Sequence, residues 1–445
     1  MTPAGAPPAT VVGGGLAGCE AAWALAERGV RVRLVEMRPL RRTPAHQGGG
    51  LAELVCSNSF KSTETSNAHG LLKAELRRMG SRLLPCADEA SVPAGAALAV
   101  DREVFSRLVE AQIGAEPLIS VERAEVTEIP SPGVIATGPL TSQALAESLA
   151  RRLGGSSLAF YDAIAPIVSR ESLREDRLYA LSRYGKGGGD DYLNAPLDQE
   201  EYQRFIGALV TADQHQGHEF DAVPYFEGCL PVEEMARRGP DTLRFGPMKP
   251  VGLTDPRTGR EPWAVVQLRR EDQAGQMWNL VGFQTRLRIP EQQRVLRMIP
   301  GLEEAEFLRY GSIHRNTYLN APDCLGEALT ARDDPRLFFA GQMTGVEGYT
   351  ESLATGRLAG LNLARVLEGR SPTVPPPTTM LGAIYRYLRE ADPANFQPMN
   401  ANWGLVDPLP DSVPARGRGA PRKDERKRML VTRAEEDFGT WLATL

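Results

Sequence analysis

The chain has 445 residues, of which 42% are hydrophobic and 24% charged, and its formal net charge is −5. This composition is typical of a folded globular protein and excludes gross disorder, and at roughly 100–200 residues per domain the length predicts more than one domain. No run approaches the roughly 18–20 apolar residues that a membrane helix requires, and the Pro/Ala-rich first ten residues do not resemble a signal peptide. Five cysteines without a disulfide or zinc-binding pattern predict a reducing cytoplasm and no metal site.

A glycine-rich turn follows the first predicted strand. Residues 9–12 are apolar, and glycines follow at 13, 15 and 18 in the spacing G-x-G-x-x-G. A helix is predicted over 19–28, and a second strand, over 30–35, ends at an acid. Such glycines permit a tight turn and a close approach to a pyrophosphate, while the acid accepts a hydrogen bond from ribose. The pattern predicts a dinucleotide site made of Gly13, Gly14, Gly15, Leu16, Ala17, Gly18, Glu36 and Arg38.

A second glycine-rich segment, near the C-terminus, indicates which dinucleotide binds. A strand predicted over 336–340 runs into residues 341–348, and a helix is predicted over 352–367. Flavoproteins with this kind of N-terminal site commonly close it with a late strand followed by an acid that meets the flavin ribityl chain. Gln342 stands in that acid's place, and an amide can still bond a hydroxyl. FAD is therefore favoured over NAD, with Gly341, Gln342, Gly345, Val346 and Glu347 completing the site.

The residues between these two segments predict an insertion. A helix capped by Asp101 is expected up to Gly114, strands are expected within 119–138, and a helix is expected over 141–153. From about Phe160 to Pro322 the composition changes, with more tyrosine, arginine and chain breaks. We therefore predict an α/β fold: a Rossmann-like, glutathione-reductase-like FAD-binding domain in two parts, 1–160 and 323–445, with an inserted α/β domain at 161–322. The glycine run 185–189 is expected to be a mobile loop.

Basic residues gather in two places. Residues 416–433 hold eight basic and two acidic residues, a local charge of +6 on an acidic chain. Such a stripe is either a phosphate footprint or a solvated, partly mobile tail, and the sequence favours neither. Arginines also occur between the two halves of the FAD domain: Arg269, Arg270, Arg286, Arg288, Arg294 and Arg297. They could hold phosphates, although each alone more often lies on a solvated surface.

Two cysteines have settings that suit chemistry. Cys229 precedes Pro231, two acids, two arginines and a Gly-Pro stop, which predicts a short helix whose N-terminus would stabilise a thiolate. Cys56 lies in the polar stretch Cys-Ser-Asn-Ser59. For each, a small buried structural cysteine is the alternative. Cys19, Cys86 and Cys324 are expected to be structural.

The whole chain resembles the folate- and FAD-dependent tRNA uracil-5-methyltransferases, the TrmFO family of short Gid-type flavoproteins. The matching segments run in order along the chain at 13–18, 36–39, 43–46, 56–59, 70–73, 93–95, 100–102, 226–231, 246–250, 281–285, 314–317 and 341–348. The resemblance implies methylation of C5 of the T-loop uridine of tRNA, giving ribothymidine. It implies 5,10-methylenetetrahydrofolate as one-carbon donor, FAD as redox cofactor and NAD(P)H as reductant, bound without a Rossmann domain of its own.

The resemblance also implies roles for single residues. Both cysteines are expected to be essential, with Cys229 as the nucleophile at uracil C6 and Cys56 as a helper near the flavin. His314 is the candidate to stack on the folate pterin, and a surface or hydrogen-bonded histidine is the alternative. The T-arm of tRNA is the expected partner, with the uridine swung out to reach the flavin, and neither a membrane nor a metal is expected.

Two other functions remain open on the sequence. One is a Gid-type flavoprotein that adds an aminomethyl group at the wobble uridine with a GTPase partner, but such chains carry an additional C-terminal helical domain, and here 97 residues follow Gly348. The other is a non-catalytic FAD-containing RNA-binding module, which would not need Cys229 at a helix start.

Overall fold

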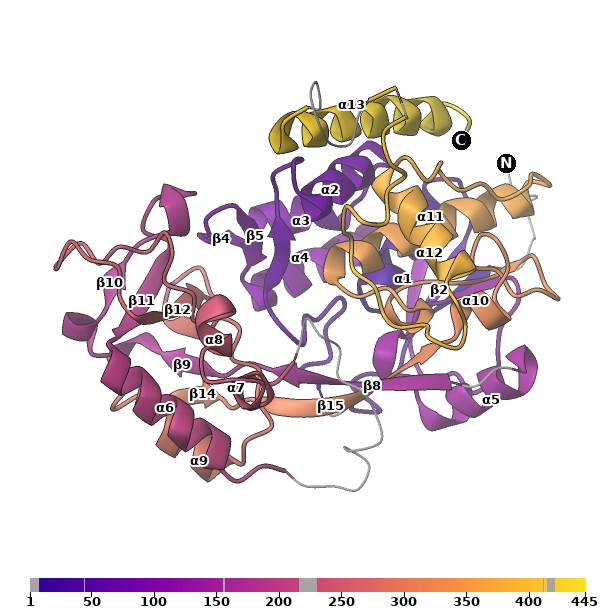
Figure 1. Cartoon of the computed structure of the whole chain (residues 1–445). Coiled ribbons are helices and arrows are strands. Elements are labelled where there is room, and N and C mark those ends of the chain that lie inside the picture. Colours follow the sequence, from indigo (N-terminus) through magenta and orange to yellow (C-terminus); the bar gives the residue numbers. More distant parts are fainter. Residues whose placement is uncertain (1–7, 44, 155–156, 216–229, 411, 414–420) are drawn as a thin grey trace.

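The structure is a computed structural model that describes residues 8–43, 45–154, 157–215, 230–410, 412–413 and 421–445 (Figure 1). The side chains of residues 157–162 and 313–315 lie outside this description. Within the described residues, no helix has the length and apolar character to cross a bilayer, and no group of three or more His, Cys, Asp or Glu side chains is arranged to hold a metal ion.

A five-stranded parallel sheet forms the centre of the first hydrophobic core. Its strand order is β16-β7-β1-β2-β6. The strands are β1 (Ala9–Val12), β2 (Val32–Glu36), β6 (Ile119–Arg123), β7 (Gly133–Ile135) and β16 (Leu337–Phe339). Val12 of β1 pairs with Val35 on one side and Ile135 on the other, so the carboxyl ends of the strands share one edge. Because β16 pairs with β7, the late segment joins the N-terminal glycine turn at that edge.

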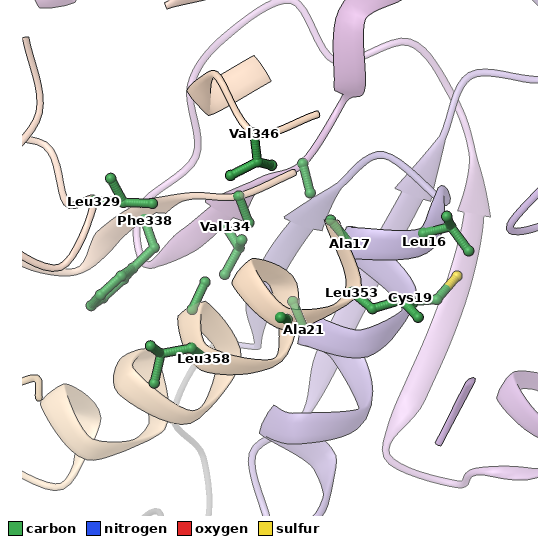
Figure 2. Packing of buried hydrophobic residues seen from close by; sticks show 14 of the residues in the cluster. Leu16, Ala17, Cys19, Ala21, Val134, Leu329, Phe338, Val346, Leu353 and Leu358 are labelled. Carbon is green, nitrogen blue, oxygen red and sulfur yellow. The ribbon is translucent and has the colours of Figure 1, made fainter. Parts of the chain in front are cut away.

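Two helices pack closely beside this sheet. They are α1 (Leu16–Ala26) and α11 (Tyr349–Leu367), and Figure 2 shows Ala17 and Ala21 of α1 near Leu353 and Leu358 of α11. A Cβ atom added at Gly356 would lie 2.2 Å from the Ala17 carbonyl oxygen, and one at Gly360 would lie 2.4 Å from that of Ala21. Glycine at these positions therefore lets the two backbones touch. Both helices begin three residues earlier than predicted, directly after Gly15 and Gly348, which are their N-cap residues.

The remaining elements of the first core surround this centre. Asp101 caps α4 as predicted, accepting from the Glu103 and Val104 N–H groups at 3.1 Å. A small antiparallel sheet has the order β3-β5-β4. The bounds are β3 (Ser59–Ser62), α2 (Ala68–Arg78), α3 (Leu83–Glu89), β4 (Ser91–Val92), β5 (Ala97–Val100), α4 (Arg102–Ala115), α5 (Gln143–Leu153), α10 (Ala321–Cys324), α12 (Met380–Glu390) and α13 (Lys423–Leu442).

A six-stranded antiparallel sheet, order β10-β11-β12-β13-β9-β14, carries a second hydrophobic core that includes Phe205, Trp278 and Phe283. Its elements are β9 (Ile167–Ser169), β10 (Tyr179–Ala180), β11 (Tyr192–Leu197), α6 (Gln199–Thr211), α7 (Val232–Arg237), α8 (Thr242–Phe245), β12 (Ala264–Arg270), β13 (Met277–Leu280), α9 (Ile289–Leu296) and β14 (Phe307–Arg309). The ribbon of β8 (Ser157–Ile164) and β15 (Ser312–Leu319) runs between the two cores (Figure 1). The α/β fold with a Rossmann-like domain is as predicted; the domain boundaries at 160/161 and 322/323 stay a prediction.

The glycine run 185–189 contains turns, and a Cβ atom added at Gly187, where φ is +68°, would lie 2.6 Å from the Gly95 Cα atom. The mobility of this loop stays a prediction. The basic C-terminal stretch is not a tail from residue 423 onward but belongs to α13, which lies over α2 (Figure 1). Phe438 and Trp441 are buried there, and Arg78 donates to the Glu435 carbonyl oxygen at 2.6 Å. Residues 414–420 lie outside the described part of the chain.

Candidate functional site

A cavity lies at the carboxyl edge of the parallel sheet. Residues from the glycine turn and from the late segment face each other across it, as the sequence predicts for a split site. Its lining includes Gly13, Gly15, Leu16, Ala17, Glu36, Arg38, Gly341 and Gln342 from the predicted set. Gly14, Gly18, Gly345, Val346 and Glu347 are not among its lining residues, and Glu347 lines an adjoining cavity.

The glycines of the first turn have different structural roles. Gly13 has φ +104°, and an added Cβ atom would lie 2.5 Å from the Ala136 carbonyl oxygen at the end of β7. A Cβ atom at Gly18 would lie 1.8 Å from the Gly13 carbonyl oxygen, so helix α1 needs glycine there to approach the turn. At Gly15 an added Cβ atom meets nothing within 4 Å, and the residue lines the cavity. The backbone at Gly15 is therefore open to a ligand.

Glu36 is an anionic acceptor at the end of β2. Its Oε2 atom accepts from the Gly14 N–H at 2.8 Å, and its Oε1 atom accepts from the Arg38 backbone N–H and Nε at 2.9 and 3.0 Å. Burial opposes ionisation, but these bonds and the Arg38 charge hold the pKa of Glu36 below its ordinary value. Arg38 also donates to Glu53 at 2.7 Å. Arg38 thus fixes two carboxylates in the cavity wall.

The late segment closes the opposite side. The Gln342 Nε2 atom donates to Glu347 at 2.6 Å, and with its nitrogen engaged the amide offers its carbonyl oxygen as an acceptor. Gly341 has φ +76° and lies beside Ala17 of α1. Gly345, with φ +92°, packs against Phe396, and Val346 is fully buried, so these two support the segment. The first turn of α11 contributes Tyr349 and Ser352 to the cavity.

These residues fit the FAD that the sequence predicts. The cavity meets the N-terminal turns of α1 and α11, whose free N–H groups favour phosphate. The open backbone at Gly15 and the ionised Glu36 are placed for a pyrophosphate and a ribose hydroxyl.

Cys56 lines a second cavity that adjoins the first. Its thiol lies 3.9 Å from the Ala163 carbonyl oxygen of β8, and the residue is half-buried. The two cavities share the following lining residues: Val55, Pro139, Leu140, Gln342, Tyr349 and Ser352. Cys56 therefore lies beside the end of the dinucleotide cavity formed by Gln342 and α11, and its role near a flavin stays a prediction. By contrast Cys19, Cys86 and Cys324 are buried, and burial raises the pKa of each thiol.

Two predicted site residues cannot be placed. Cys229 lies outside the described residues, and so does the side chain of His314, whose backbone in β15 pairs with Asp162 of β8. The helix after Cys229 is α7, which has six residues and is capped by Pro231, so Pro231 precedes the helix instead of opening it. Glu233 in its first turn is buried and accepts from Thr285 Oγ1 at 2.9 Å and the Arg286 N–H at 2.7 Å.

Sequence reasoning missed several residues of the cavities. Asn316, which is 3% exposed, lines the Cys56 cavity, and Tyr349 lines both cavities. Asn316 follows His314 in one matching segment and Tyr349 follows another, so both had a local signal. Most of the arginines proposed to hold phosphates have protein partners: Arg269 donates to Asn58 at 3.0 Å, Arg286 pairs with Glu234, Arg294 with Glu291, and Arg297 donates to the Ala305 carbonyl.

Comparisons with known proteins agree with this geometry. The family model described as glucose inhibited division protein A matches residues 8–371. A relative from Geobacter sulfurreducens, named "Methylenetetrahydrofolate--tRNA-(uracil-5-)-methyltransferase TrmFO", is 58% identical over 438 residues, which are 98% of this chain and 99% of the relative. A Thermus thermophilus protein of the same name is 56% identical over 437 residues, 98% of this chain and 96% of that protein.

Among solved structures, GidA from Aquifex aeolicus in the form II crystal superposes with a TM-score of 0.69 at 15% identity, over 98% of this chain and 74% of that chain. At this identity the likeness concerns the fold alone. The near full-length identity to the Geobacter and Thermus proteins is more specific. The chain belongs to the glucose inhibited division protein A family, and within it to the TrmFO group.

Proposed function

We propose that this protein methylates C5 of a uridine in tRNA, with methylenetetrahydrofolate as one-carbon donor and FAD as redox cofactor. The observation that carries the proposal is the 58% identity over 98% of the chain to a protein of that name. The position of Cys56, beside a cavity that fits FAD, supports the proposal, because the methylation reaction can use a thiol near the flavin.

Uracil C5 is too weak a nucleophile to take a one-carbon unit unaided. A thiolate that adds to C6 makes a C6–S bond and turns C5 into an enolate carbon, which can attack the methylene carbon of the folate. Loss of the C5 proton then breaks the bond between this carbon and the folate nitrogen and releases tetrahydrofolate. Two-electron reduction of the exocyclic methylene group, with departure of the thiolate from C6, gives the methyl group and frees the enzyme. We assign the thiolate to Cys229 and keep Cys56 as a helper near the flavin. When bound, FAD supplies the two electrons that bring the transferred carbon from the formaldehyde level to a methyl group.

Three finer features belong to the same proposal. The uridine is in the T-arm of tRNA, the reductant that recharges the cofactor is NAD(P)H, and His314 stacks on the folate pterin. The resemblance of residues 314–317 and 341–348 to the TrmFO pattern supports them. The cytoplasm is the proposed compartment, which agrees with the free thiols of Cys19, Cys56, Cys86 and Cys324. The inserted domain is proposed to span 161–322.

The alternatives have less support. The 58% identity over 98% of this chain to the Geobacter relative named as a tRNA (uracil-5-)-methyltransferase favours C5 methylation over wobble-uridine modification. A non-catalytic RNA-binding module gives no reason for Cys56 to line a cavity that adjoins a dinucleotide site.

An omission series tests the proposed reaction. Unmodified tRNA is incubated with the purified flavoprotein, methylenetetrahydrofolate and NADH or NADPH, and 5-methyluridine is measured after nuclease digestion. We expect product only with all components present. Product that forms without the folate, or only when S-adenosylmethionine is added, would contradict the proposal.

A further inference from the structure

The segment 54–58, which carries Cys56, has no regular secondary structure although it lies between the two cores. Backbone polar groups in such a place need partners, and here side chains from elsewhere supply them. Arg102 Nη1 donates to the Leu54 carbonyl oxygen at 3.2 Å, and its Nη2 atom lies 3.5 Å from that of Cys56. Arg309 Nη2 donates to the Val55 carbonyl oxygen at 3.1 Å. Consecutive carbonyl groups are thus bound by two arginines.

The hydroxyl of Tyr349 binds the other groups of this segment. The N–H groups of Cys56 and Ser57 both donate to it at 3.1 Å, and it donates to the Ser57 carbonyl oxygen at 2.8 Å. A phenol has one donor and two acceptor sites, so its hydrogen-bonding capacity is used in full. Burial also raises the pKa of Tyr349, which keeps the hydroxyl protonated. This hydroxyl is therefore fully engaged with the backbone of the Cys56 segment.

The anchors come from both cores. Tyr349 begins α11 and Arg102 begins α4, whereas Arg309 ends β14 of the six-stranded sheet. Arg102 is itself held by Glu271, next to β12, with Nε and Oε2 2.9 Å apart and Glu271 2% exposed. Asn58 completes the link, because its amide donates to the carbonyl oxygens of Val100 at 3.0 Å and Arg270 at 2.8 Å. The position of the Cys56 backbone thus depends on how the two cores meet.

We propose that Tyr349, Arg102 and Arg309 are positioning residues that fix the Cys56 backbone at the edge of the flavin site, with Arg309 carrying the contribution of the second core. Only the chemical task of Cys56 rests on the proposed function. The positioning itself is a property of this chain and has a readout that does not need the reaction.

The test is the alkylation rate of Cys56 in the flavin-loaded protein, measured with iodoacetamide and mass spectrometry of the Cys56 peptide. Tyr349→Phe keeps the ring that lines the cavity and removes three hydrogen bonds, so we expect labelling to rise about tenfold. Tyr385→Phe is the matched control: this buried hydroxyl has no hydrogen-bond partner among the described residues, and its loss should leave the rate unchanged. Flavin absorbance shows that both variants are loaded.

A second pair of variants tests the contribution of the second core. Arg309→Met removes the donor to the Val55 carbonyl and should also raise labelling of Cys56, whereas Arg309→Lys retains a donor and should restore most of the protection. In methylation assays Tyr349→Phe and Arg309→Met should lower kcat with little change in KM for the folate. Labelling at the wild-type rate in both variants overturns the proposal.

The outcomes separate the two proposals. If wild type makes no 5-methyluridine but labelling follows the expected pattern, the proposed function fails and the positioning role stands. If wild type methylates tRNA and the variants label like wild type, the positioning role fails alone.

Discussion

At the scale of single residues, Gly15 and Gly18 give a matched test of the flavin site. An added Cβ atom at Gly15 enters open space in the cavity, whereas one at Gly18 lies 1.8 Å from the Gly13 carbonyl oxygen. Gly15→Val should therefore keep the stability of the apoprotein and lose visible flavin absorbance. Gly18→Ala should lower the free energy of unfolding by about 1–3 kcal/mol in urea. Full flavin occupancy in Gly15→Val would contradict the site.

The two cysteines can be separated with a substrate analogue. Fluorine at C5 blocks the proton loss that releases the enzyme, so tRNA carrying 5-fluorouracil should trap a covalent complex visible on a denaturing gel. We expect Cys229→Ala to abolish this complex and Cys56→Ala to slow turnover while still trapping. Cys324→Ala, at a buried thiol that lines neither cavity, serves as control. A complex kept by Cys229→Ala and lost by Cys56→Ala would exchange the two roles.

At the scale of elements, helix α2 carries a buried cation. Lys73 is 2% exposed, its Nζ atom donates to the Ser62 and His69 carbonyl oxygens, and burial lowers its pKa to about 8 from 10.5. Between these values the unfolded chain binds more protons than the folded one, so the free energy of unfolding should rise with pH, by up to about 3 kcal/mol. Urea unfolding at pH 7.5 and 10 should show this rise reduced in Lys73→Met but kept in Lys423→Met, at an exposed site. An equal rise of the free energy of unfolding in wild type and in Lys73→Met would contradict the assignment of this pH dependence to Lys73.

Local sequence patterns predicted some of the elements but not the contacts between distant segments. The glycine turn, Glu36 at the end of β2 and the Asp101 cap are local patterns, and the structure places them as expected. The anchors of the Cys56 segment were not predictable in this way, because Arg309 and Tyr349 are 254 and 293 residues from the groups they bind. Their meeting depends on the pairing of distant strands and on the contact between the cores. Helix α13 was missed for a similar reason: its composition is that of a solvated tail, whereas burial of Phe438 and Trp441 and contacts such as Arg78 with the Glu435 carbonyl fix it.

At the scale of the whole molecule, tRNA binding by a chain of net charge −5 requires a local basic surface. The first turns of α13 present Lys423, Lys427 and Arg428 on a partly exposed face. Affinity for tRNA should fall steeply with salt, and replacing these three by Gln should weaken binding and reduce the slope of log K against log salt by about 3. Arg433 is unsuitable for this test because it donates to the Pro408 carbonyl and belongs to the fold. Unchanged affinity of the triple variant for tRNA would show that this face of α13 is solvated and does not bind tRNA.

In the proposed reaction the folate carbon becomes the methyl group of a tRNA uridine. The most direct measurement follows methylenetetrahydrofolate labelled with ¹³C in its methylene carbon into unmodified tRNA, with mass analysis of nuclease fragments. We predict the label in 5-methyluridine of the T-arm fragment, and no label in the anticodon fragment. Label in an aminomethyl group at the wobble uridine, or an unlabelled methyl group in the T-arm, would contradict the account.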